Sequence, residues 1–292
     1  MFYLVGSIIL TSYLVLSFKL VERLNLNAFQ VIVFNYITCV ITGSLFNGHF
    51  PVNNNTLDQP WFIWAAVMGI FFISLFTVVA ATTQQVNVAV ASVAYKLSLV
   101  IPFIFSIYLY NEQATALKIT GIVVALAAVI LTCWPSKKNN KSASKAQWLL
   151  IVLPLTLFIG SGLLDTMIKY VEQAFLNDSN KNDYLVTAFT SAALIGIVLL
   201  GIQFISGKQK FAWKALLMGI GIGIPNYFSI WCLVQVLKAY PDSSSIIIPV
   251  NNMGIVLFGT VVAWLVFKER LSWLNWTGVI LSLAAIALIA YG

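Results

Sequence analysis

The sequence predicts an all-α integral membrane protein whose ten transmembrane helices form two inverted repeats of five helices each. Three observations predict this class: the composition, a series of long apolar runs and an internal repeat. The 292 residues are 60% hydrophobic and only 9% charged, with a mean hydropathy of +0.94. A soluble domain carries about 25% charged residues. Because so few charges cannot cover a water-facing surface, the lipid bilayer is an expected partner of this chain.

Ten apolar runs are long enough to cross a bilayer, which takes roughly 20 mostly apolar residues per helix. Strands are not expected, because the runs are too long and lack the alternation of a transmembrane barrel. The predicted helices span residues 2–21, 28–46, 61–81, 88–110, 117–134, 148–171, 184–206, 213–238, 243–267 and 273–291.

Polar segments rich in turn-forming residues separate the runs. Residues 47–60 read NGHFPVNNNTLDQP, and residues 135–147 read PSKKNNKSASKAQ. We therefore expect a first five-helix repeat at residues 1–136, a basic connecting loop at 137–147 and a second five-helix repeat at 148–292.

An internal repeat relates the two halves. Residues 117–131 read LKITGIVVALAAVIL and residues 274–288 read LNWTGVILSLAAIAL, with seven of the fifteen positions identical at an offset of 157. Glu112 and Glu269 fall in register just upstream of these two stretches.

A second match, at an offset of 150, extends the repeat. It pairs KLVE at 19–22 with KYVE at 169–172, and MGI at 68–70 with MGI at 218–220. Five helices is an odd number, so the second copy enters the membrane from the opposite face. Inverted repeats are a common plan of secondary transporters, with the substrate site near the midplane between the halves.

The net charge of +7 is interpreted as a feature of membrane topology. Nucleic acid is not an expected partner, because the basic residues lie mostly in short gaps between apolar runs, where the positive-inside rule applies. If both termini are external, four basic residues lie outside: Lys118, Lys169, Lys181 and Lys238. Eleven then lie on the cytoplasmic side: Lys19, Arg23, Lys137, Lys138, Lys141, Lys145, Lys208, Lys210, Lys214, Lys268 and Arg270. The rule therefore favours external termini.

Two stretches carry a resemblance to a known family, YNEQATALKITGIVVALAAVIL and FKERLSWLNWTGVILSLAAIALIAYG. Each is similar to the short acidic turn and the Gly-containing last helix of a repeat in the drug/metabolite transporter superfamily, in particular its ten-helix EamA-like family. The resemblance covers the whole chain and implies export or exchange of small metabolites. Lys96 departs from the family pattern, in which this helix often carries apolar or small residues.

Lys96 is the first candidate site residue. It lies inside the run at 88–110, about 12 Å from the start of that run at 1.5 Å per residue. A charge at a bilayer centre costs at least roughly 2.5–3.5 kcal/mol. Snorkelling is marginal from this depth, and neighbouring carbonyls or an amide could satisfy the lysine structurally. We expect a substrate-binding role, with Ser92 one turn earlier on the same face.

Asn251 and Asn252 are the second candidate group. At an offset of 157, Lys96 maps to Met253, so the two asparagines lie at the same membrane level in the second repeat. Adjacent residues of a helix point in different directions, so at most one of them can face a central cavity squarely. The other is expected to bond a neighbouring helix, which contributes about 0.6–2 kcal/mol.

A glycine-rich segment, MGIGIGIPNYFSIWC at 218–232, is expected to interrupt its helix. Gly219 and Gly223 lie four residues apart, which lets a neighbouring backbone approach closely. Interrupted helices near a repeat interface are the best sequence indication of a transporter site. The candidate ligand residues after this break are Asn226, Tyr227 and Trp231.

Other polar residues are less specific. Asn35 lies in the middle of the second run and is kept as a binding candidate. Asp165 and Lys169 are four residues apart, which suits a local ion pair, with a role for Asp165 in proton coupling as the alternative. The turns at Glu112 and Glu269 are expected to connect helices structurally.

Several chemistries are not expected. The three cysteines, Cys39, Cys133 and Cys232, show no CxxC spacing and are interpreted as small buried hydrophobic residues. With a single histidine and no cluster of acids, a metal site lacks ligands. No GxxxxGK[ST] motif occurs, so nucleotide-driven transport by this chain alone is not expected, nor is any other cofactor.

The function predicted from the sequence is a secondary transporter, an exporter or exchanger, of a small polar or amphipathic metabolite. Amino acids or related carboxylates fit best, because Lys96 could hold a carboxylate and amides could bind polar groups. The main alternative is a translocator of lipid-linked sugars or lipids. A membrane enzyme and a non-transporting scaffold are weaker alternatives. The expected location is the bacterial cytoplasmic (inner) membrane.

Overall fold

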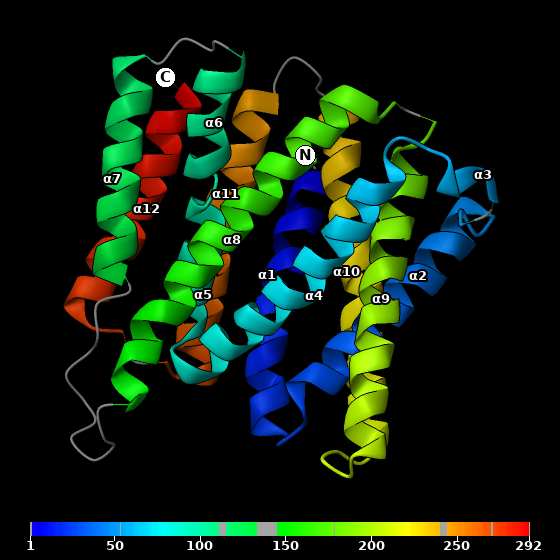
Figure 1. Ribbon diagram of the computed structural model, residues 1–292. Coiled ribbons are helices and arrows are strands. Elements are labelled where there is room, and N and C mark those ends of the chain that lie inside the picture. The colour runs from blue at the N-terminus through cyan, green and yellow to red at the C-terminus, as the bar shows by residue number, and fades with distance from the viewer. Residues whose placement is uncertain are drawn as a thin grey trace. The chain divides into compact units, whose positions relative to one another are not determined.

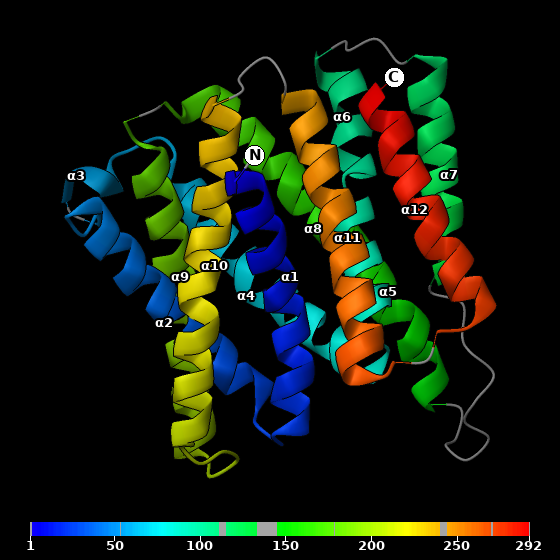
Figure 2. The same cartoon turned by 180° about the vertical axis from the view of Figure 1, so that it is seen from behind.

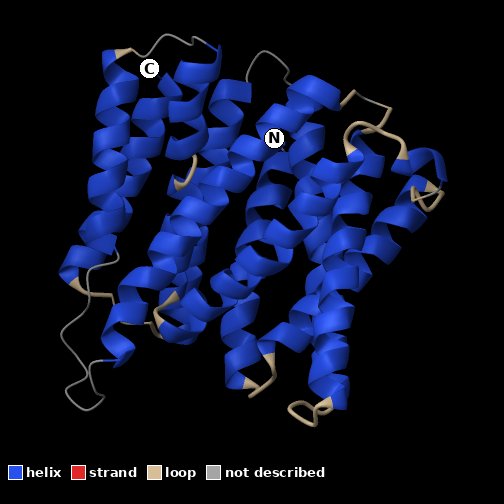
Figure 3. Cartoon of the chain, in the orientation of Figure 1, coloured by secondary structure: helices blue, strands red, loops and turns tan. Residues whose placement is uncertain are grey.

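The computed structural model describes residues 2–52, 54–110, 115–132, 145–177, 179–239, 244–269 and 271–291. These residues form helices joined by short loops, and none of them lies in a strand (Figure 3). Most of the predicted connecting loop, together with Cys133, Glu112 and Arg270, lies outside the described residues.

The described residues form twelve helices. Eight of these helices, and a ninth span made of α5 and the first part of α6 (Val88–Phe105), are long and apolar enough to cross a membrane. The shorter apolar helix Ala116–Thr132 completes the ten predicted spans. The helices are α1 Phe2–Arg23, α2 Ala28–Asn47, α3 Asn54–Leu57, α4 Phe62–Gln85, α5 Val88–Leu97, α6 Val100–Tyr110, α7 Ala116–Thr132, α8 Lys145–Phe175, α9 Lys181–Ile205, α10 Trp213–Ala239, α11 Ser244–Phe267 and α12 Trp273–Tyr291. The predicted fold class is confirmed.

Two predicted details of the helices are wrong. The run at 88–110 is two helices, α5 and α6, and not one. Conversely, α10 runs from Trp213 to Ala239 without the interruption expected at its glycines. Pro225 lies inside this helix and does not end it.

The chain divides into two compact units, each built from segments of both halves of the sequence. Unit 1 comprises residues 1–19, 78–163 and 229–292, and unit 2 comprises residues 20–77 and 164–228. Four helices, α1, α4, α8 and α10, contribute to both units.

In unit 1, α7 packs against α12, which are the last helices of the two repeats (Figures 1 and 2). A Cβ atom placed on Gly121 of α7 would meet Ile289 of α12, 2.7 Å away. Conversely, a Cβ on Gly278 of α12 would meet Thr132 of α7. Gly121 and Gly278 are 157 positions apart, as are Thr132 and Ile289. The two contacts are therefore equivalent under the repeat, and the two helices run antiparallel.

Unit 2 contains the same kind of reciprocal contact between α2 and α9. A Cβ on Gly43 would lie 2.7 Å from Val186, and a Cβ on Gly196 would lie 2.8 Å from Val33. Both the glycines and the valines are 153 positions apart. These helices too are equivalent and antiparallel, as an inverted repeat requires.

The glycines of the two MGI motifs have equivalent roles in unit 2. Gly69 of α4 lies against Ser191 and Ala192 of α9, and Gly219 of α10 lies against Phe34 of α2. Each motif therefore brings one helix against the second helix of the other repeat. These sites need glycine because a side chain would separate the packed helices.

Candidate functional site

The break between α5 and α6 lies at Ser98 and Leu99, in the middle of a membrane span (Figures 1 and 3). The span covers Val88–Phe105, so that Lys96, the ninth of its 18 residues, comes just before the break. The lysine therefore lies in the last turn of a half-helix and not in a continuous helix.

Pro102 explains the break. A proline has no N–H and its ring clashes with the carbonyl four residues earlier, here that of Ser98. The Ser98 carbonyl instead accepts from Ile101 N–H at 2.9 Å, one residue short of an α-helical bond. The Ser98 hydroxyl in turn donates to the carbonyl of Tyr95 at 2.6 Å. The sequence shows a proline four residues after this serine, but the continuous hydropathy of the run favoured a single unbroken helix.

Lys96 is half-buried, whereas most of α5 is buried. Its Nζ lies 4.3 Å from the centre of the Tyr95 ring, within the range of a cation–π interaction. The last carbonyls of a helix carry a partial negative charge, which favours a cation in the final turn. The helix break thus places the negative end of α5 beside Lys96 at mid-span depth.

Helix α5 packs against α11, and two contacts give their register. The N–H of Val88 donates to the carboxylate of Glu269, just after α11, and Ser92 Oγ lies 3.2 Å from the Cβ position of Gly259. Residue numbers rise along α5 while those of the contacting residues on α11 fall, so the two helices are antiparallel. One further turn along α5 brings Lys96 to the level of about Ile255.

Buried polar atoms without a hydrogen-bond partner gather along this helix pair. Within the described residues, they are Ser92 Oγ on α5 and Asn251 Oδ1 and Thr260 Oγ1 on α11. Their side chains are 1–3% exposed, and the neighbouring Asn252 is also buried. A buried polar atom left without a partner costs about 1–3 kcal/mol, so each one needs a ligand, a water or another explanation.

The group offers both donors and acceptors of hydrogen bonds. Lys96 offers up to three N–H donors, Ser92 both donates and accepts, and Asn251 Oδ1 accepts. A carboxylate would suit the lysine, and an ammonium would suit the asparagine oxygen. This α5–α11 group, which we define as Lys96, Ser92, Asn251 and Asn252, lies entirely in unit 1.

The sequence-predicted residues of unit 2 lie in a different setting. Asn226 Nδ2 on α10 donates to Asn35 Oδ1 on α2 at 3.1 Å. Cys39 donates weakly to the carbonyl of Gly223 at 3.4 Å, and lies 3.8 Å from the same Asn35 oxygen. All of these groups are buried, and they hold α2 and α10 together.

The two aromatic candidates also pack within their own units. Tyr227 in unit 2 is 3% exposed, and its hydroxyl donates to Asn47 Oδ1 at 3.5 Å. Trp231, in unit 1, makes an edge contact with Tyr3, with ring centres 5.5 Å apart. The expected interruption of α10 before these residues is absent, because Gly219 and Gly223 serve close helix packing along a continuous helix.

Glu269 has a specific structural role that the sequence did not reveal. Both of its carboxylate oxygens accept from the first N–H of α5, that of Val88, at 3.2 and 3.0 Å. Lys19 Nζ lies 4.0 Å from the same carboxylate. A negative charge at a helix N-terminus is favourable, so Glu269 positions the helix that carries Lys96. The expectation that Glu269 serves structure is consistent with these contacts.

An inverted helical repeat with discontinuous spans is a common plan of membrane transporters. The model of the EamA-like transporter family matches residues 1–134. Residues 1–134 are thus similar to that family, and the resemblance predicted from the sequence is confirmed over these residues. The family is one of transporters, which supports a membrane transporter of small molecules as the coarse class.

Two further comparisons cover nearly the whole chain. An uncharacterized protein of Haemophilus influenzae is 26% identical over 284 residues, which span 94% of this chain and 92% of that protein. The crystal structure of one protein superposes with a TM-score of 0.64 at 14% identity, covering 98% of this chain and 94% of that one. At this identity, the likeness shows the fold alone.

Proposed function

We propose that the protein is a secondary transporter, an exporter or exchanger, of amino acids or related small carboxylates. The α5–α11 group is the proposed substrate site. The single observation that carries the proposal is the position of Lys96, a cation in the last turn of a half-helix at the middle of a membrane span. Intramembrane lysines at such breaks are characteristic of substrate or ion sites.

The polar atoms around this position support the choice of substrate. Lys96 would bind the substrate carboxylate, and Asn251 Oδ1 would accept from an ammonium or hydroxyl group. Ser92 Oγ, which has no partner among the described residues, would complete the recognition of polar groups. A ligand that satisfies buried polar atoms binds specifically, because an analogue lacking those groups leaves them unpaired.

Transport would follow the alternating-access scheme of inverted repeats. In that scheme, the two repeats rock around a fixed site near the midplane, which opens to one face and then the other. The reciprocal glycine contacts of α7 with α12 support this proposal, because they give the repeats equivalent helix packing.

The membrane in question is proposed to be the bacterial cytoplasmic membrane. The similar protein from Haemophilus influenzae supports a bacterial setting. Fractionation of a tagged protein between inner and outer membranes tests this location.

Counterflow in liposomes tests the transport proposal. Purified protein is reconstituted, the liposomes are loaded with one unlabelled amino acid or carboxylate, and uptake of the labelled compound is measured. We expect one class of these compounds to drive transient accumulation in wild type and not in Lys96→Gln. Lys118→Gln is the matched control, because Lys118 also approaches an aromatic ring, that of Phe103, at 5.4 Å. Counterflow of lipid-linked sugars alone would support the alternative function instead.

A further inference from the structure

A cavity of about 560 Å³ lies at the turn between α11 and α12. It belongs to unit 1 and combines aromatic, aliphatic and charged side chains. The residues that line it are Trp264, Leu265, Lys268, Glu269, Leu271 and Trp276. Neither the proposed transport nor the helix-capping role of Glu269 explains a cavity here.

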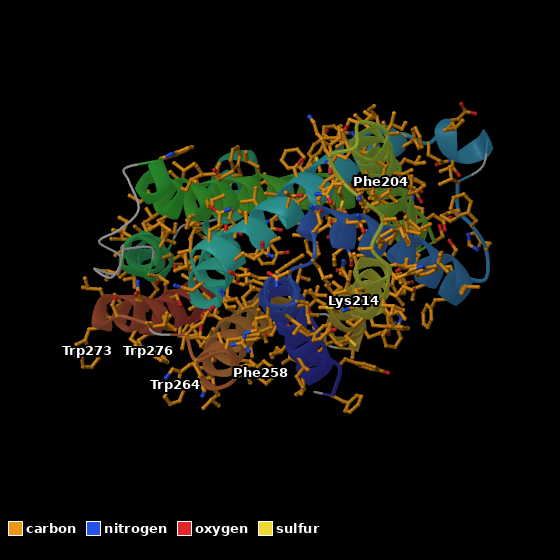
Figure 4. All side chains as sticks on the ribbon, turned by 90° about the horizontal axis from the view of Figure 1, so that it is seen from below. Phe204, Lys214, Phe258, Trp264, Trp273 and Trp276 are labelled. Atoms are coloured by element: carbon orange, nitrogen blue, oxygen red, sulfur yellow. The ribbon has the colours of Figure 1, made fainter. Side chains whose placement is uncertain are left out.

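The aromatic residues place this cavity at the membrane–water interface. Trp264 is 52% exposed and Trp273 is 83% exposed. Together with Trp276, these indoles project from α11 and α12 on the same side of the two helices (Figure 4). Tryptophan is enriched at the level of the lipid headgroups, because its ring is apolar and its N–H is polar. The cavity therefore opens where headgroups lie.

Lys268 has a backbone conformation that is unusual for a residue with a side chain. It has a φ of 55° directly after α11, a left-handed position that usually holds glycine. This conformation is strained for a residue that has a side chain. Its side chain is exposed and forms no ion pair within the part of the chain that the structure describes. The lysine thus places a cation at the mouth of the cavity, in a conformation that glycine would adopt more easily.

The charges of the cavity are of both signs. Lys268 suits a phosphate, whereas the Glu269 carboxylate and the faces of Trp264 and Trp276 suit an ammonium. Exposed Leu265, on the same helix, can contact acyl chains. We propose that this cavity binds the phosphoethanolamine headgroup of a membrane phospholipid, with the phosphate on Lys268 and the ammonium against Glu269 and the indoles.

Lipid titration of the purified, delipidated full chain tests this binding. Native mass spectrometry measures the affinities for phosphatidylethanolamine, phosphatidylglycerol and diacylglycerol. We expect phosphatidylethanolamine to bind most tightly and diacylglycerol most weakly. Equal binding of diacylglycerol would overturn the proposal, and equal binding of phosphatidylglycerol would overturn the assignment of the ammonium. Soluble glycerophosphoethanolamine should compete weakly; competition as strong as that of the intact lipid would overturn the membrane source of the ligand.

Lys268→Gly separates binding from folding. Glycine relieves the left-handed strain, so the melting temperature of the lipid-free protein should not fall. The loss of one cation should weaken phosphatidylethanolamine binding about fivefold. Lys268→Arg should retain most of the affinity. Lys208→Gln, which removes another exposed lysine, is the control. If Lys208→Gln weakens binding as much as Lys268→Gly, the cavity is not the lipid site.

Discussion

The carboxylate of Glu269 accepts a hydrogen bond from the backbone N–H of Val88 at 3.0 Å, 181 residues earlier in the chain. The contact joins the end of α11 to the start of α5, and it lies two turns before Lys96 on α5. Side chains that accept from the first turn of a helix satisfy N–H groups that the helix itself cannot satisfy. The position of the half-helix that carries Lys96 therefore depends on Glu269.

Replacing Glu269 should destabilise the protein. Glu269→Ala removes a charged acceptor from a largely buried N–H, which should lower the free energy of unfolding by roughly 1–3 kcal/mol. Glu269→Gln keeps an acceptor oxygen and should lose less. Thermal unfolding in detergent measures both changes. Glu172→Ala is the control, since Glu172 forms an exposed ion pair with Lys181, of a kind that contributes about 0–1 kcal/mol. Equal losses in Glu172→Ala and Glu269→Ala would contradict the capping role.

Gly223 should not tolerate even a methyl group. A Cβ there would lie 2.6 Å from the carbonyl of Asn35 and 2.5 Å from Thr38, so α2 and α10 would have to separate. We expect Gly223→Ala to destabilise the protein by about 1–3 kcal/mol. Gly201→Ala is the matched control, because no atom lies within 4 Å of its Cβ position. Melting temperatures and yields compare the two variants. Equal stability would show that α2 and α10 do not need this close approach.

The bond between Asn35 and Asn226 should contribute to stability and not to substrate affinity. In a double-mutant cycle with alanine at both positions, we expect a coupling energy of about 0.6–2 kcal/mol, as for hydrogen bonds between membrane helices. The apparent affinity for substrate in counterflow should stay within about twofold of wild type. A cycle with no coupling, combined with weaker substrate binding, would instead assign these asparagines to the substrate site.

The positive-inside rule predicts that the loop after α9 is cytoplasmic and that the loop before α9 is external. Cysteines placed at Ser206 and Ser179 mark these two loops, both at exposed positions. In a protein from which the three native cysteines have been removed, an impermeant reagent added to intact cells should label Ser179→Cys and not Ser206→Cys. The opposite pattern would place both termini inside.

Much of the fold could be predicted because a membrane helix is encoded locally. Length and hydropathy gave all ten spans, and the sequence of the last helix in each repeat revealed the repeat. The packing partners were not readable in the same way. Gly43 contacts Val186, and Gly196 contacts Val33. The sequence around these residues does not mark them as partners. They become visible only when α2 and α9 lie together.

The candidate site was only partly predictable, for two physical reasons. Prolines are tolerated in membrane helices when the freed carbonyl finds another donor, so Pro102 alone could not separate a break from a kink. Whether a buried amide has a partner depends on helices distant in the sequence. Asn35 and Asn251 look alike in the chain, yet among the described residues the Asn35 oxygen accepts a bond from Asn226 while its Nδ2 has no partner, and the Asn251 oxygen has none.

Lys96 decides whether the α5–α11 group binds substrate. If the lysine holds a carboxylate, Lys96→Met should fold but bind the substrate identified by counterflow at least about tenfold more weakly, since hydrogen bonds to charged groups contribute about 1.5–3 kcal/mol. Lys96→Arg keeps the charge but changes the shape of the donor, so it should retain partial function. Lys118→Met removes a lysine elsewhere in unit 1 and should bind as wild type does.

The stability of the same variants separates binding from a structural role. Removing a charge from mid-span relieves a desolvation cost, so Lys96→Met should melt at or above the temperature of wild type when no substrate is present. Added substrate should then raise the melting temperature of wild type and of Lys118→Met, but not that of Lys96→Met, because ligand stabilises a protein only as far as it binds the folded state. Titration calorimetry with the same substrate measures the affinities directly. If Lys96→Met binds as tightly as wild type but melts well below it, the lysine stabilises the broken span and does not anchor the substrate.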